Sequence, residues 1–411
     1  MLETLHAPGI SFYSNPRAAS ADQAYGDQRS QVMNQAGFAA AHAQITQWPG
    51  YAPTPLVHLP GLAHSLGLKA LYYKDESKRF ALKSFKALGG AYAVFRLIQQ
   101  AVVREYGHVP GPDDVLSGRY RDVISKLTVT CATDGNHGRS VAWGAQTFGC
   151  QCVIYVHAQV SQGRADAIAA FGARVERVDG NYDDSVRHAD NQARLHGWTV
   201  VSDTTYEGYR DIPIDVMHGY GVMAQEVVDA MRDEPPTHVI AQAGVGAFAS
   251  AICASFWLAW GPRRPRFVVV EPQAAACLYE SGLAGHLVAV HGELDTVMAG
   301  LACGEVSPVA WEILRAGAND FVKIDDRFAL QAMSMLAKPS SADQPIVSGE
   351  TGAAGLGMLV ALGQSAGLAG ALGIDHESRV LLLGSEGDTD PAIYHDVVGL
   401  TAQEVLKQEL A

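Results

Sequence analysis

Three short segments of this 411-residue chain hold residue types that can do chemistry together. Lys86 stands within residues 84–90, among small residues that leave room around a reactive amine. Residues 133–138 (Thr-Asp-Gly-Asn-His-Gly) and 243–247 (Ala-Gly-Val-Gly-Ala) follow further along. A primary amine can condense with an aldehyde, and turns of this kind bind anions through backbone N–H groups. Taken alone, Lys86 could be an ordinary solvated lysine on a helix. The prediction of a chemical site therefore rests on the three segments occurring together and in this order.

The glycine-rich segment has more than one interpretation. Residues 239–249 read as an apolar strand, a turn and a helix, an arrangement that aims N–H groups and a helix N-terminus at a phosphate. The turn comprises Gly244, Val245, Gly246 and Ala247. The same residues satisfy the dinucleotide fingerprint G-x-G-x-x-A, with Glu271 at the end of the next strand to bind a ribose. A dinucleotide-dependent oxidoreductase and a turn that binds nothing are therefore alternatives.

Residues 133–138 form a second strand-to-helix turn of the same type. Its N–H groups could bind a carboxylate, and Asn136 could donate to a phenolate oxygen on a ring. A dinucleotide oxidoreductase has no use for this second anion loop. An enzyme that uses pyridoxal 5′-phosphate (PLP) on an amino acid needs two, one for the phosphate and one for the substrate carboxylate. The three segments thus predict a PLP site, with Lys86 forming the Schiff base.

Composition narrows the class of protein. The length predicts two domains, and 48% hydrophobic with 18% charged residues is typical of soluble domains. A formal net charge of −13 disfavours nucleic acid and anionic membranes as partners. The apolar run 239–260 contains a glycine turn and is interpreted as a buried strand and helix, not a membrane span. No secretory signal is recognised at the start, so we expect a cytoplasmic enzyme.

The six cysteines show no zinc-binding spacing, and we expect no metal site. In a cytosolic enzyme, all six are expected to be reduced cysteines in the core. For Cys277 and Cys303, in segments after the strand that ends at Glu271, a disulfide bordering the site is the alternative. Such a bond would stabilise the fold by roughly 3 kcal/mol on the chain-entropy model.

Strand and helix patterns alternate regularly from residue 127 onward. Strands are expected at 127–132, 151–156, 175–178 and 199–202, between helices at 136–148, 161–171 and 185–196. A second set includes strands at 238–242, 267–271 and 380–384. This rhythm predicts an α/β fold of two domains, each an open, mostly parallel twisted sheet with helices on both faces. The large, cofactor-binding domain is placed at 1–98 plus 215–411 and the small domain at 99–214, with 1–50 an irregular extension.

From about residue 53 to 392 the chain resembles the fold type II (tryptophan synthase β-like) PLP enzymes, and more narrowly the diaminopropionate ammonia-lyases. Besides the segments above, the resemblance is carried by residues 161–164, 171–173, 180–184, 203–209, 298–304 and 384–389. It implies α,β-elimination of 2,3-diaminopropionate to pyruvate and ammonia by a homodimer. Elimination on serine, threonine or another β-substituted amino acid is the alternative within the same fold type, and the sequence leaves open whether both isomers react.

The resemblance also implies roles for individual residues. Lys86, preceded by Phe85 in the cofactor site, would carry PLP and remove the α-proton, while Asn136 would contact the ring oxygen. Gly244 to Ala247 would bind the phosphate. A small hydroxyl residue usually faces the pyridine nitrogen in this fold type, and Ser385 and Thr389 are both candidates.

Asp134 distinguishes the substrate classes, because the related dehydratases usually have a serine there. A β-ammonium group places a cation in the site, and Asp134 and Asp203 could attract it. Asp134 is also our candidate base for the D-isomer, on the face that Lys86 cannot reach. The alternatives are a helix cap for Asp134 and a strand-end turn for Asp203. The remaining substrate-binding candidates are Thr133, Gly135 and His137.

Overall fold

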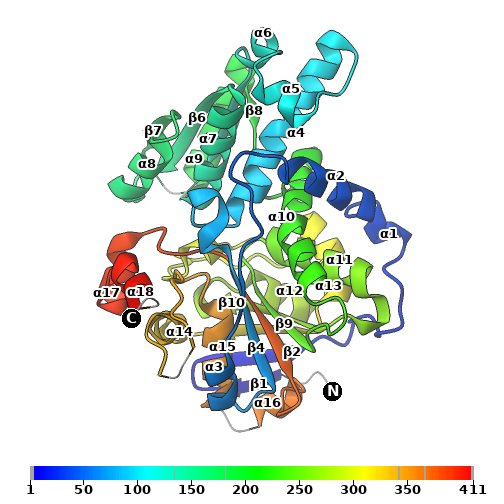
Figure 1. Ribbon diagram of the computed structural model, residues 1–411, viewed down its shortest axis with the longest axis vertical. Helices are drawn as coiled ribbons and strands as arrows, with labels where there is room; N and C mark the ends of the chain where they lie inside the picture. Colours follow the sequence, from blue (N-terminus) through cyan, green and yellow to red (C-terminus); the bar gives the residue numbers. More distant parts are fainter. Residues whose placement is uncertain (1–3, 134, 181, 341–342, 365–366, 409–411) are drawn as a thin grey trace. The chain divides into compact units, whose positions relative to one another are not determined.

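The computed structural model describes residues 4–133, 135–180, 182–340, 343–364 and 367–408 (Figure 1). The chain forms two compact units. The first unit comprises residues 1–35, 53–84 and 223–411, and the second comprises residues 36–52 and 85–222. Each unit contains its own sheet, as the α/β pattern predicts.

The first unit is built on an eight-stranded sheet. Its strands, in spatial order, are β1 (Thr4–Ala7), β2 (Ile10–Ser14), β11 (Asp320–Ile324), β10 (Arg266–Pro272), β9 (His238–Gln242), β12 (Arg379–Gly384), β4 (Ala70–Asp75) and β3 (Leu56–His58). The five strands from β11 to β4 are parallel, and the edge strands pair antiparallel. Every residue of β9 is buried, as expected for a central strand that helices cover on both faces.

Helices lie on both sides of this sheet. Figure 1 shows α14 (Asp326–Ala337) and α15 (Ala354–Gly363) on one side, and α11 (Ala247–Trp260) and α13 (Pro308–Gly317) on the other. The apolar run 239–260 is the strand β9 followed by α11, as the sequence predicts. None of the described helices is both long enough and apolar enough to span a bilayer.

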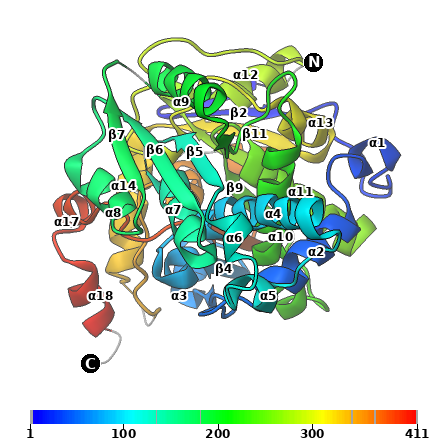
Figure 2. The ribbon, with the colours of Figure 1, turned by 90° about the horizontal axis from the view of Figure 1, so that it is seen from above.

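The second unit contains a four-stranded parallel sheet, whose strands β7, β6 and β5 run side by side in Figure 2. In spatial order the strands are β7 (Arg174–Val178), β6 (Gln151–His157), β5 (Thr128–Ala132) and β8 (Thr199–Val200). Helices α7 (Asn136–Phe148) and α9 (Tyr182–His196) pack against β5 and β6. The predicted alternation of strands and helices is therefore confirmed to within a few residues.

The two units divide the chain differently from the boundaries expected from sequence. Helix α4 (Lys86–Tyr106) belongs to the second unit, although residues up to 98 were expected in the large domain. The reason is close packing on α7, since a Cβ atom at Gly90 would lie 1.9 Å from Ser140 Oγ. Residues 36–52 also join the second unit, where the Trp48 ring lies 5.2 Å from that of Phe148.

The N-terminal segment is more regular than expected. Residues 1–50 were predicted to be irregular, but β1 and β2 form a hairpin that extends the large sheet. Strand β2 pairs with β11, so that Ile10 lies opposite Ile324. Pairing with a strand some 300 residues distant leaves no local sequence signal, which explains why the prediction was wrong here.

Candidate active site

Lys86 is the first residue of α4, and its ammonium group forms an ion pair with the Asp203 carboxylate. The two residues are 117 positions apart in sequence. Their side chains are 21% and 18% exposed, so the pair is partly open to solvent. The Lys86 amine also lies 5.5 Å from the centre of the Phe85 ring.

Asp203 carries a negative charge between two basic groups. His137 Nδ1 lies 3.8 Å from Asp203 Oδ2, and His137 Nε2 lies 2.8 Å from the carbonyl oxygen of Val201. Burial opposes ionisation of Asp203, but the charges of Lys86 and His137 outweigh it and hold the pKa of this carboxyl below its ordinary range. The arrangement therefore keeps an anion beside the Lys86 amine at neutral pH.

The backbone that leads into Lys86 is strained. Phe80, Ala81 and Lys83 all have left-handed φ angles, of 48°, 58° and 58°. Each such residue without glycine's freedom costs of order 1–3 kcal/mol, and it persists only where the surroundings hold it. Strain directly before a reactive residue is a common property of active sites.

Contacts at the end of the strained segment hold it to the loop after β12. The backbone N–H of Gly387 donates to the Lys83 carbonyl at 2.9 Å, and Lys83 Nζ pairs with Asp388 Oδ2 at 2.7 Å. Ser84 forms an isolated β-bridge with Glu386. The chain is thus fixed in the first unit only two residues before Lys86.

A buried cluster of charged side chains holds the start of the same segment. Arg79 makes a two-bond contact with Glu76, at 2.8 Å for each bond, and a second with Glu226, also at 2.8 Å. Lys74 Nζ pairs with Glu226 at 2.6 Å and donates to the Thr54 carbonyl at 2.7 Å. All four charged side chains are at most 4% exposed. We refer to Lys74, Glu76, Arg79 and Glu226 as the buried charge cluster.

The turn between β5 and α7 is closed by Thr133. Its hydroxyl oxygen accepts hydrogen bonds from the N–H groups of Gly135 at 3.0 Å and Gly138 at 3.2 Å. A Cβ atom at Gly138 would lie 2.2 Å from Thr133 Cγ2, so this position requires glycine. Asn136 opens α7 directly after the turn. Asp134 lies outside the described residues.

The glycine-rich turn in the first unit joins β9 to α11. Gly246 caps the helix with a left-handed φ of 92°, and a Cβ atom at Gly244 would lie 2.9 Å from Cys303 Sγ. Among the described residues, the backbone N–H groups of Gly244, Val245 and Gly246 have no hydrogen-bond acceptor. Successive N–H groups of this kind at a helix N-terminus form an anion-binding nest. The turn therefore fits the phosphate of PLP.

The end of β12 lies beside this turn, because β9 and β12 are parallel neighbours in the sheet. Gln242, the last residue of β9, donates from Nε2 to Ser385 Oγ at 2.7 Å and to the Leu383 carbonyl at 2.6 Å. Ser385 is 1% exposed. Thr389 lies further along the loop and donates to Glu386 Oε2 at 3.2 Å. Gln242 carried no signal in the sequence, because its role depends on the neighbouring strand.

Glu271 does not suit the ribose of a dinucleotide. Its carboxylate is fully buried and accepts the backbone N–H groups of Leu278 at 2.8 Å and Tyr279 at 2.7 Å, in the first turn of α12 (Cys277–Ala284). Burial raises the pKa of Glu271 to about 8, although these two hydrogen bonds oppose the rise. The alternative based on Glu271 is therefore wrong.

Cys277 and Cys303 border the glycine-rich turn without being bonded to each other. Cys277 Sγ lies 3.6 Å from the Gly244 carbonyl oxygen. None of the six cysteines, all of which lie in the described part of the chain, forms a disulfide. Burial raises the pKa of the Cys277 thiol far above its ordinary range, which disfavours a reactive thiolate.

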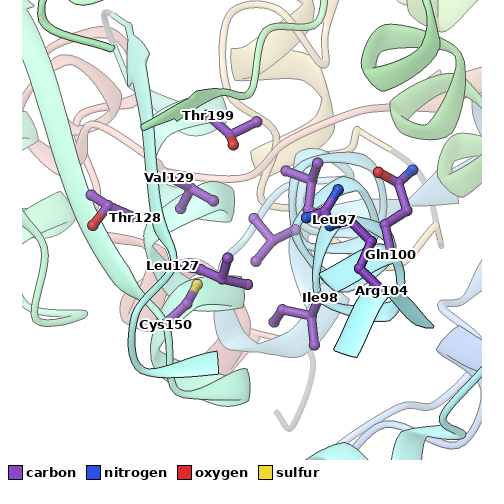
Figure 3. A pocket seen from close by; sticks show the side chains of 10 residues that line it. Leu97, Ile98, Gln100, Arg104, Leu127, Thr128, Val129, Cys150 and Thr199 are labelled. Carbon is purple, nitrogen blue, oxygen red and sulfur yellow. The ribbon is translucent and has the colours of Figure 1, made fainter. Parts of the chain in front are cut away.

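A separate hollow of about 250 Å³ lies in the second unit between α4 and β5 (Figure 3). Leu97, Ile98 and Arg104 line it from the helix, Thr128 lines it from β5, and Cys150 lines it from the residue before β6. None of the predicted site residues lines this hollow. It is distinct from the Lys86 region.

A lysine at a helix start beside a carboxylate, and a nest of N–H groups at the carboxyl end of a central parallel strand, fit a PLP enzyme of fold type II. Residues 47–384 match the family model described as "Pyridoxal-phosphate dependent enzyme". Over 356 residues the chain is 43% identical to the diaminopropionate ammonia-lyase of Escherichia coli (strain K12), covering 85% of this chain and 88% of that one.

Crystal structures of the diaminopropionate ammonia-lyase from Escherichia coli are similar over almost the whole chain. The complex with an aminoacrylate-PLP azomethine reaction intermediate gives a TM-score of 0.84 at 39% identity, covering 97% of each chain. The complex with D-serine gives 0.85 at 38% identity, with the same coverage. The chain therefore belongs to the pyridoxal-phosphate dependent enzymes and, within them, to the diaminopropionate ammonia-lyases. It is a lyase whose cofactor is PLP, as the resemblance in sequence implies.

Proposed function

We propose that the protein eliminates ammonia from 2,3-diaminopropionate and yields pyruvate and a second ammonia. The observation that carries the proposal is the ion pair between Lys86 and Asp203. It provides a basic amine and an anion in one place, for proton transfer and for attraction of a cationic substrate. The 43% identity to the Escherichia coli enzyme supports the choice of substrate.

We assign Lys86 the covalent attachment of the cofactor and the transfer of the α-proton. Bound PLP supplies an electron-accepting ring that stabilises negative charge at the substrate α-carbon. The N–H groups from Gly244 to Ala247 bind its phosphate, and Asn136 and Phe85 contact its ring. For the pyridine nitrogen we favour Ser385 over Thr389. Because Ser385 Oγ accepts the Gln242 amide, its own proton is available for donation to an unprotonated nitrogen.

The substrate's charge explains the acidic residues in this proposal. A β-ammonium group leaves as neutral ammonia, so the site needs an anion to bind it more than an acid to protonate it. Asp203 provides an anion, since its pKa is depressed beside Lys86 and His137. In our proposal Asp134 provides a second anion for the substrate ammonium group. The hydroxyl of Thr133 and the N–H groups near Gly135 and His137 bind the substrate carboxylate.

We further propose that both isomers react, because the related Escherichia coli enzyme has been crystallised with D-serine. Lys86 reaches one face of the substrate and Asp134 the other. Replacement of Asp134 with asparagine should therefore reduce turnover of the D-isomer more than that of the L-isomer. Equal losses for both isomers would remove the proposed role. We also propose that the enzyme is cytoplasmic and forms a homodimer. Gel filtration with light scattering would test the dimer.

A substrate panel tests the function directly. Purified protein with PLP would be assayed for pyruvate and ammonia on D- and L-2,3-diaminopropionate, D- and L-serine, and L-threonine. We expect the highest kcat/KM on 2,3-diaminopropionate, with two ammonia molecules released per pyruvate. A preference for serine or threonine would assign the protein to dehydratase-type elimination instead. Lys86→Ala serves as the inactive control, and borohydride reduction followed by peptide mapping should locate the cofactor on Lys86 in the wild-type chain.

A further inference from the structure

Helices α4 and α10 (Asp211–Ala230) approach so closely near Lys86 that only glycine fits between them. A Cβ atom at Gly219 would lie 2.2 Å from the Leu88 carbonyl oxygen. A Cβ atom at Gly89 would lie 2.4 Å from Tyr220 Cε1. The two glycines therefore let Tyr220 lie against α4, about one helical turn from Lys86.

The Tyr220 side chain is buried next to the reactive amine. Its ring is 1% exposed and lies 4.7 Å from the ring of Phe85. The Lys86 amine is 5.8 Å from the centre of the Tyr220 ring. Burial raises the pKa of Tyr220 above its ordinary range, and the charge of Lys86 opposes the rise. The phenol is therefore neutral at the pH at which the enzyme works.

A neutral phenol and a carboxylate hold an amine in different ways. Asp203 attracts the ammonium form of Lys86, and most of this attraction disappears when the nitrogen loses its proton. A phenol oxygen accepts an N–H more strongly from the ammonium, but it still accepts one from the neutral amine. Lysine has four rotatable side-chain bonds, and the geometry of proton transfer depends on where its nitrogen is held.

We propose that Tyr220 is a positioning residue for Lys86, whose hydroxyl oxygen keeps the nitrogen in place after its proton has left. The inference rests on the proposed role of Lys86 and does not depend on which amino acid is the substrate. A purely structural role predicts a different outcome, since phenylalanine would preserve the packing on Phe85 and α4.

Chemical labelling of the cofactor-free protein tests the proposal without an activity assay. Lys86 would be labelled with an amine-reactive anhydride over a range of pH, and its rate read by peptide mass mapping against the exposed Lys126. Under the proposal, Tyr220→Phe removes an acceptor that favours the ammonium form, so we expect Lys86 to react about 3- to 10-fold faster near neutral pH. Unchanged labelling of Lys86 relative to Lys126 would overturn the proposal.

Two further measurements sharpen the test. In the PLP-loaded enzyme, Tyr220→Phe should lower kcat about tenfold with little change in KM, because the affected step follows binding. Gly89→Ala should move the Tyr220 ring and raise the Lys86 labelling rate, whereas Gly363→Ala, with no atom near the added methyl group, should leave it unchanged. If Gly89→Ala does not fold, the labelling rate of Lys86 in Tyr220→Phe still tests the proposal. Because the labelling needs no substrate, failure of the proposed reaction would be recognised separately in the substrate panel.

Discussion

Two of the lysine–carboxylate pairs in this protein differ in their surroundings. Lys74 and Glu226 are at most 4% exposed and belong to the buried charge cluster, in which two cations and two anions share many hydrogen bonds. Lys86 and Asp203 are about a fifth exposed, with His137 as the neighbouring ionisable group. In these two pairs, an ammonium and a carboxylate meet in one case shielded from solvent and in the other partly exposed to it.

The difference agrees with our proposal that the Lys74 pair is structural and the Lys86 pair takes part in the chemistry. Buried ions are tolerated when every charge is compensated, and a compensated cluster resists proton exchange with solvent or substrate. A partly exposed pair can give up one partner at a small energetic cost. The buried charge cluster fixes the strained segment before Lys86, whereas the Lys86 pair remains partly accessible to solvent.

The largest expected effect is on activity. Lys86→Ala should lower kcat/KM by at least about 10³-fold, because in our proposal Lys86 both carries the cofactor and transfers the proton. The free energy of unfolding of the cofactor-free protein should change by less than about 1 kcal/mol, since the pair is open. Steady-state kinetics and urea denaturation measure the two quantities. A large loss of stability in Lys86→Ala, with turnover retained, would indicate that Lys86 has a structural role and not a catalytic one.

The reverse pattern is expected for the buried charge cluster. Glu226→Ala leaves Lys74 and Arg79 without one of their anions and should cost about 3–5 kcal/mol of stability. Urea denaturation of the cofactor-free protein measures the loss, with Asp203→Ala as the matched variant of the open pair. Equal losses for the two variants would show that burial does not separate them.

Another carboxylate, Glu271, is buried, and no cation among the described residues contacts it directly. It should make stability depend on pH in a recognisable way. Its pKa is about 8 in the folded protein, so the folded state binds the proton more tightly than the unfolded state does. Stability should fall by up to about 1.4 kcal/mol per pH unit between pH ~4.5 and 8 from this group alone. Glu271→Gln should flatten that part of the profile, measured by urea denaturation at several pH values.

Asp203 should act in the opposite direction. Because its folded pKa is depressed, its ion pair stabilises the protein above the ordinary aspartate pKa of about 3.9, and this contribution is lost as pH falls. The difference in stability between the wild-type chain and Asp203→Asn, both without cofactor, should therefore shrink below about pH 4. A difference that stays constant down to pH 3 would contradict the ion pair.

The smallest effect concerns the strained segment. Ala81→Gly relieves a left-handed alanine while giving the unfolded chain more freedom, so we expect stability to change by less than about 1 kcal/mol in either direction. The control Ala43→Gly, in the helix α2 (Gln35–Ile45), should lose about 1 kcal/mol because it has no strain to relieve. Thermal unfolding of the two variants would show the difference, and an equal loss at both sites would argue against strain at Ala81.

The sequence predicted well the local backbone of the segments that we assign to the site. The turn from Gly244 to Ala247 joins a strand to a helix, and its glycine pattern depends only on neighbouring residues. The same holds for Asn136, which opens α7 at the expected residue. The assignment of Glu271 to a ribose was wrong, because an acidic residue at a strand end can equally cap a helix seven residues later.

The sequence by itself determined the alternation of strands and helices, the position of Lys86 and the phosphate turn, because backbone periodicity and glycine geometry are local properties. Only the tertiary structure decided that Lys86 meets Asp203 and Tyr220, and that Lys74 is closed off by Glu226. These contacts join residues more than 100 positions apart, and they depend on how helices pack. Burial then sets the chemistry, since the same lysine–carboxylate pair reacts or remains inert according to how completely its charges are enclosed.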